Sequence, residues 1–165
     1  MSAIDAVADD LQDLAVLWSV GEVGAQDVVE VACSALVAGL DSPGLRILAG
    51  YSRGEAEYEV PDVLPGVLDE LGLVFYPRES EAGRDACVRA LAHQHLAGRL
   101  TPRELAFRVH RRFGHQLPPA ERLAELDDEY DIVEYGNRTV AQLDAEVTAE
   151  ARRLTDGWPE RHRRT

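Results

Sequence analysis

The chain of 165 residues is 45% hydrophobic and 28% charged, which is typical of a folded globular protein and unlike a disordered one. Its formal net charge of −13 disfavours nucleic acids and anionic membranes as partners, because phosphate groups bind to concentrated positive charge. No segment approaches the roughly 20 apolar residues that span a bilayer, and the aspartate-rich N-terminus lacks the basic start of a secretory signal, so we expect a cytoplasmic protein.

Four helices are predicted in the first half of the chain from apolar residues at steps of three and four. The first ends before Gly21, and Ser42 followed by Pro43 indicates the N-cap and first residue of the third. Pro61 and Pro65 are expected to break or bend the start of the fourth. The predicted ranges are 4–18, 26–40, 43–48 and 60–71.

Four more helices are predicted after the segment FYPRES, residues 75–80, which is the best candidate for a boundary between two halves. Thr101 and Glu104 form the pattern of a capping box, and Thr139 is a second N-cap. The predicted ranges are 82–96, 101–113, 118–136 and 139–154. Because no segment alternates as a strand does, the expected fold is all-α, a compact bundle of about seven or eight helices.

One all-helical domain is expected over residues 1–158, with sub-units at 1–75 and 78–158 and a basic, disordered tail at 159–165. An internal repeat supports the division. The segment GEVGAQDVVEVA from Gly21 aligns with GRLTPRELAFRV from Gly98, and in each a glycine ends one helix before the next begins. Two duplicated helical hairpin units would explain this pattern, although helix–glycine–helix hairpins are also common in unrelated proteins.

The sequence lacks the motifs of several kinds of catalytic site: it has no glycine-rich phosphate-loop motif, no GxSxG motif and no HExxH motif. His93 and His95 are two residues apart, so on one helix they point about 200° away from each other and cannot chelate one ion. His110 and His115 belong to the following helix, where we interpret His115 as a cation at the helix C-terminus. We therefore expect no catalytic residue, no metal ligand and no cofactor.

The segment ELDDEYDIVEYG, residues 125–136, holds six carboxylates and two tyrosines in twelve positions. On one continuous helix, a stripe of acids runs beside the apolar face that carries Tyr130, and Tyr135 lies near it. The stripe consists of Asp127, Asp131 and Glu134.

Two interpretations of this stripe remain open. Arginines of the preceding helix, such as Arg108, Arg111 or Arg112, would pair with it inside the molecule. Alternatively, the three acids with Tyr130 and Tyr135 form a surface that binds a basic partner protein, because tyrosine beside acids offers contact area and a hydrogen bond at low entropic cost.

Three segments, LAGYSRGEAEYEV, LTPRELAFRVHRRFGH and ERLAELDDEYDIVEY, resemble a group of small streptomycete helical proteins of unassigned function. The likeness covers about residues 10–154. It implies an actinobacterial cytoplasmic origin and brings no catalytic residue. In size, charge and helicity alone, the chain is also similar to the immunity proteins that neutralise basic nuclease toxins.

The expected function is therefore non-catalytic: an acidic protein-binding module that engages a basic partner protein, with toxin neutralisation as its most concrete form. The alternative is a small carboxylate-dependent enzyme, or an accessory subunit of one, with its acids in a cleft between the halves. A third interpretation, a self-associating structural protein, would need a large exposed apolar patch. The oligomeric state is not predicted.

Overall fold

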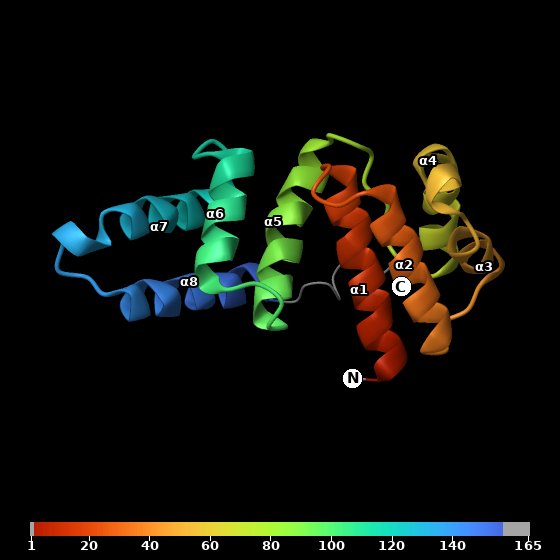
Figure 1. The fold of residues 1–165 in the computed structure, drawn as a ribbon, viewed down its shortest axis with the longest axis horizontal. Helices are drawn as coiled ribbons and strands as arrows, with labels where there is room; N and C mark the ends of the chain where they lie inside the picture. The colour runs from red at the N-terminus through yellow and green to blue at the C-terminus, as the bar shows by residue number, and fades with distance from the viewer. Residues whose placement is uncertain (1, 157–165) are drawn as a thin grey trace. The chain divides into compact units, whose positions relative to one another are not determined.

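The computed structural model describes residues 2–156, and every regular element in this range is a helix (Figure 1). The all-α prediction is confirmed. The eight α-helices are α1 (Ala3–Ser19), α2 (Ala25–Val37), α3 (Pro43–Ala49), α4 (Arg53–Glu70), α5 (Glu81–Leu96), α6 (Pro102–Phe113), α7 (Glu121–Asp131) and α8 (Val140–Thr155), with 3-10 turns η1 (Pro118–Ala120) and η2 (Val133–Tyr135). The predicted tail at 159–165 lies outside the described residues. No helix within 2–156 combines the length and apolar character needed to cross a membrane.

The helices form two compact units, which are described separately. The first unit extends to Arg84 and contains α1 to α4 with the beginning of α5. The second starts at Asp85 and contains the rest of α5 with α6, α7 and α8. The division thus falls inside α5, a few residues after the predicted boundary segment 75–80.

In the first unit, α2 packs against α1, α3 and α4, and α3 also packs against α4. The shared core is made of side chains from all four helices. They include Leu11, Trp18, Val28, Leu45, Leu48, Leu64 and Leu68. Burial of these aliphatic and aromatic groups is the main source of stability in such a unit.

A polar contact fixes the chain that leaves α4 against α1. The amide of Gln12, a buried residue of α1, donates from Nε2 to the carbonyl oxygen of Val74 and accepts at Oε1 from the Val74 N–H, both at 2.8 Å. The side chain therefore satisfies both backbone groups of Val74, which has no helical partner for them.

The start of α4 differs from the prediction by about seven residues. The helix begins at Arg53 and continues through Pro61 and Pro65, where the sequence predicted a broken start near residue 60. Its start is fixed by a capping box, in which the Ser52 hydroxyl accepts from the Glu55 N–H and the Glu55 carboxylate accepts from the Ser52 N–H at 2.7 Å. This N-cap is a local signal strong enough to start the helix ahead of both prolines.

In the second unit, α6 packs against α7 and α8, and α7 packs against α8. The imidazole of His95, in α5, reaches the Thr148 hydroxyl at 2.9 Å through Nε2 and the Leu100 carbonyl oxygen at 2.8 Å through Nδ1. These two hydrogen bonds explain the burial of this polar ring, because they attach α5 to α8 and to the turn before α6.

The helix predicted over 118–136 is shorter in the structure. It ends at Asp131, and the chain continues through η2 with hydrogen bonds from Tyr135 N–H to Ile132 O and from Gly136 N–H to Val133 O. The ion pair from Arg138 to Glu129 at 2.8 Å draws the following chain back toward α7. Glu134 consequently lies on η2 and does not continue the acidic stripe along α7.

The turns from α1 to α2 and from α5 to α6 share one geometry. Gly21 and Gly98 have φ of 78° and 82°, and each donates its N–H to the carbonyl three residues earlier. The next N–H of each turn donates to the carbonyl five residues earlier, which completes a Schellman motif. A carboxylate three residues after the N-cap then accepts from the N-cap N–H in both, Asp27 from Gly24 and Glu104 from Thr101, and Thr101 completes a capping box because its hydroxyl also accepts from the Glu104 N–H. The same pair of hydrogen bonds and a positive φ also occur at Gly39 and Gly72, so this geometry is common to several helix ends and duplication of the two hairpins stays a prediction.

A network of two arginines and two glutamates joins α7, α8 and the loop between them. Arg138 pairs with Glu146 at 2.6 Å and with Glu129 at 2.8 Å, while Arg122 reaches Glu146 at 3.0 Å and Glu129 at 3.7 Å. The Arg138 guanidinium holds the pKa of Glu146 below its usual range by a direct hydrogen bond.

We expect Glu146→Gln to lower stability at neutral pH and to have no effect in acid. A lowered folded-state pKa stabilises the fold above about pH 4.3, the ordinary value for glutamate, and this contribution is lost as the pH falls through the folded pKa. Urea unfolding of the wild type and the variant at pH 7 and pH 3 measures the difference, with Glu57→Gln in α4 as the exposed control. An equal difference at both pH values would contradict this assignment.

Candidate functional site

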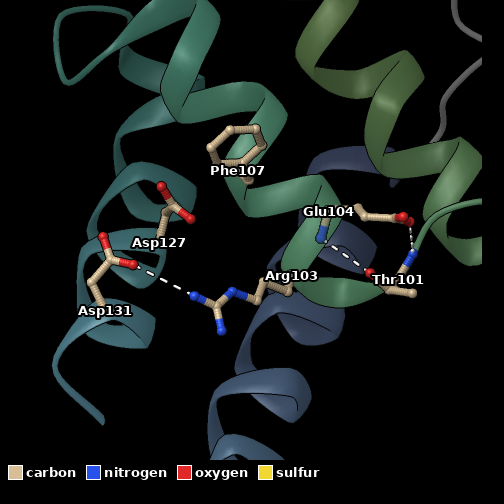
Figure 2. Close-up of a pocket in the computed structure, with 6 residues that line it drawn as sticks. All are labelled: Thr101, Arg103, Glu104, Phe107, Asp127 and Asp131. Atoms are coloured by element: carbon tan, nitrogen blue, oxygen red, sulfur yellow. Dashed lines mark hydrogen bonds and ion pairs between the residues drawn. The ribbon is translucent and has the colours of Figure 1, made fainter.

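A hollow of about 470 Å³ opens between α6 and α7 in the second unit (Figure 2). The N-terminal half of α6 supplies one side of it, and α7 supplies two aspartates that face those residues. The lining consists of Thr101, Arg103, Glu104, Phe107, Asp127 and Asp131.

The hollow combines an exposed aromatic ring with negative charge. Phe107 is 50% exposed although it is a large apolar side chain. Asp131, on α7, has a side chain that is 71% exposed and faces Arg103, with its carboxylate 3.5 Å from the guanidinium, whereas Phe107 lies nearer Asp127 (Figure 2). At this distance and exposure the ion pair is weak, so a competing cation can displace Arg103.

Asp127 is the more buried of the two aspartates, at 9% exposure. Its Oδ2 accepts a hydrogen bond from Nδ1 of His110, on α6, at 2.8 Å. The structure shows His110 as a partner of Asp127 and Arg103 as a partner of Asp131, and Arg103 is an arginine of the preceding helix, as one interpretation of the sequence expected. This part of the stripe is paired within the molecule.

The two tyrosines of the predicted surface have different environments. Tyr130 is 2% exposed and donates its hydroxyl to Asp144 Oδ1 on α8 at 2.5 Å. Burial, followed by this hydrogen bond, raises the pKa of Tyr130 well above its usual range. Its ring belongs to the core, with the Arg103 guanidinium 5.3 Å from the ring centroid. Tyr135, on η2, is exposed together with Glu134.

The predicted partner-binding set is thus divided between two places. Asp127 and Asp131 line the hollow, Tyr130 lies beneath it in the core, and Glu134 and Tyr135 are exposed on η2.

Two features of this region were missed by the sequence interpretation. Phe107 lies outside the apolar stripe of α6, and a lone phenylalanine at a polar position was the available signal. His110 and His115 were treated as unrelated, yet the structure brings both against Asp128 of α7. His115 follows the end of α6 and pairs with Asp128 at 3.0 Å, in addition to any effect of the helix dipole.

Comparison of the chain with protein-family models, curated proteins and solved structures found no match. The geometry of the site alone therefore carries the functional argument.

Proposed function

We propose that the protein is a non-catalytic protein-binding module that engages a basic partner protein through the hollow between α6 and α7. The observation that carries this proposal is a hollow of about 470 Å³ whose lining includes both a half-exposed phenylalanine, Phe107, and an exposed aspartate, Asp131. An arginine side chain of a partner suits this site, because its guanidinium stacks on aromatic rings and forms bidentate pairs with carboxylates.

The contacts of Arg103 within the site favour its replacement by the guanidinium of a partner. Arg103 already places its guanidinium between Asp131 and the Tyr130 ring, so the site binds this group within its own chain. Because that pair is exposed and 3.5 Å long, a better placed guanidinium from a partner would replace it at little cost. Neutralisation of a basic toxin is the most concrete form of this function.

A competing acidic surface lies in the first unit. Residues 2–84 carry 16 acidic residues and four arginines, whereas residues 85–156 carry 13 acidic residues and ten arginines. On α4, Glu57, Tyr58, Glu59 and Asp62 are all exposed. Non-specific attraction of a basic protein would act there at least as strongly as at the hollow, so the test must separate the two surfaces.

The test compares matched double substitutions, each removing one aromatic ring and one negative charge. Phe107→Ala/Asp131→Asn alters the hollow, and Tyr58→Ala/Asp62→Asn alters α4. Each purified variant is used to capture proteins from a lysate of the organism that encodes it, at low and at physiological salt. We expect a basic protein to be retained by the wild type and the α4 variant, and its affinity to fall about 10-fold or more in the hollow variant, because an aromatic ring at a contact centre is worth over 1 kcal/mol.

Equal retention by all three proteins, or loss only in the α4 variant, would contradict the proposal. A third variant, Glu134→Gln/Tyr135→Ala, determines whether the contact extends to η2. We expect every variant to fold, because all substituted side chains are exposed, and circular dichroism checks this.

A further inference from the structure

Two imidazoles and one carboxylate meet where α6 ends beside α7. His110 belongs to the last turn of α6, His115 follows that helix, and Asp128 lies on α7. One nitrogen of each ring and one carboxylate oxygen lie within 4.8 Å of one another. The closest of these contacts joins Nε2 of His115 to Oδ2 of Asp128 at 3.0 Å.

A left-handed glycine brings the two histidines together. Gly114 has φ of 59° and donates its N–H to the carbonyl oxygen of His110 at 2.8 Å, which ends α6 and turns the chain back. The His115 ring then stands edge-on to the His110 ring, with centroids 4.9 Å apart and an interplanar angle of 66°. Residues five apart on a regular helix would not face each other in this way.

A second carboxylate, that of Asp127, is hydrogen-bonded to the His110 ring. Asp127 Oδ2 is 2.8 Å from Nδ1 of His110, and Asp127 is almost fully buried. Nδ1 is also the His110 nitrogen nearest to Asp128, at 3.8 Å from its Oδ1. With Nδ1–H donated to Asp127, Nε2 carries the lone pair of a neutral imidazole, so an ion bound through Nε2 requires the His110 ring to reorient. This arrangement of carboxylate, histidine and metal recurs in protein zinc sites, where it fixes the ring and strengthens the ligand.

We propose that His110, His115 and Asp128 form a binding site for a divalent transition-metal ion of the zinc type. Two imidazole nitrogens and one carboxylate oxygen are donors that zinc accepts, whereas calcium and magnesium prefer oxygen alone. Ligand atoms of a tetrahedral zinc site lie about 3.3–3.6 Å apart, given bonds of about 2.0–2.2 Å. The atoms here already lie within 4.8 Å of one another, so modest side-chain rotations suffice.

The surroundings suit such an ion. The side chains of His115 and Asp128 are about half exposed, so an ion reaches them directly from solvent. The carboxylates of Asp127 and Asp128 supply negative charge to offset the ion. Three protein ligands leave a fourth position for water or for a donor from another molecule. Asp127 lies beside both sites, but neither Phe107 nor Asp131, the two residues varied in the partner-binding test, is among the metal ligands.

The test uses Co²⁺ as a probe of the full-length chain, prepared without a histidine tag and stripped with a chelator. We expect visible absorption bands of tetrahedral cobalt to saturate at one ion per chain and to be abolished by Zn²⁺ but not by Mg²⁺. His115→Ala and Asp128→Asn should each remove the bands. Asp127→Asn should weaken binding about 10- to 100-fold, as expected for a residue that orients a ligand. Asp131→Asn, one turn away on α7, is the matched control and should bind like the wild type.

Folding of each variant is followed by circular dichroism, and a Zn²⁺-dependent rise in Tm provides a second readout, because an ion that binds only the folded state stabilises it. The rise is expected in the wild type and Asp131→Asn and absent in His115→Ala and Asp128→Asn. Wild-type protein that shows neither bands nor a Tm rise would overturn the proposal, as would bands that persist in both ligand variants. The three side chains would then be ion pairs between α7 and the end of α6.

Discussion

Replacement of Leu126 by alanine is expected to lower the free energy of unfolding by about 2–5 kcal/mol, the usual range for a buried leucine. Leu126 is fully buried in α7, which packs against both α6 and α8. The substitution removes apolar contacts and leaves a cavity that neighbouring helices fill only in part. Urea unfolding followed by circular dichroism measures the loss.

The matched control for this substitution is Ile132→Ala. Ile132 follows α7 directly and is 60% exposed, so truncation of a similar aliphatic chain there should change stability by no more than about 0.5 kcal/mol. Similar losses in the two variants would show that α7 does not bury Leu126 as described. Because the hollow and the histidine cluster both need α7 packed on α6, that result would also undermine both sites.

Replacement of Gln12 by alanine is expected to cost about 2–6 kcal/mol, because two backbone groups lose their partner at about 1–3 kcal/mol each. The substitution leaves the N–H and the carbonyl of Val74 without the 2.8 Å contacts that the amide provides. Gln116→Ala, at an exposed position, is the control and should be nearly neutral.

A second variant, Gln12→Glu, separates hydrogen bonding from packing at the same site. The ionised carboxylate accepts from the Val74 N–H but cannot donate to the Val74 carbonyl, so the protonated form fits the fold better. The folded-state pKa of the introduced carboxyl is therefore raised, and its stabilising contribution is present below about pH 4.3 and lost as the pH rises through the folded value. If Gln12→Glu is as stable as the wild type at pH 7, the donated hydrogen bond contributes little.

Sequence patterns predicted the helices well where their ends depend on neighbouring residues. Ser42 with Pro43 and Thr101 with Glu104 start α3 and α6 as expected, since a capping interaction spans only three residues. The start of α4 was misjudged because the two prolines were given more weight than the equally local pair of Ser52 and Glu55.

The end of α7 could not be predicted from the sequence of the helix itself. Ile132 and Val133 continue the apolar spacing of the helix, and the next glycine is Gly136. The termination coincides with an ion pair that Arg138, beyond the turn, makes with Glu129. A contact of this kind depends on tertiary structure, so helical periodicity extended the acidic stripe one residue too far, to Glu134.

The candidate site was predictable only in part, for the same reason. The spacing of Asp127 and Asp131 placed both on one flank of α7, and both line the hollow. The other side of the hollow comes from α6, and which face of α6 meets α7 does not follow from either helix alone. The meeting of His110 with His115 depends on the turn at Gly114, where the N–H donates to the carbonyl four residues earlier, whereas at Gly21 and Gly98 it donates to the carbonyl three residues earlier. The sequence does not distinguish these turns.

The paired turns at Gly21 and Gly98 show how freely the rest of a loop can diverge. Residues 20–24 read VGEVG and residues 97–101 read AGRLT, so glycine at the second position is their only common residue. Each turn requires backbone hydrogen bonds, a positive φ and a carboxylate at the third position of the next helix, and it tolerates either glycine or threonine as the cap. The turn geometry therefore constrains few of the five side chains directly, and we expect most of the differences between the two pentapeptides to reflect what each turn packs against.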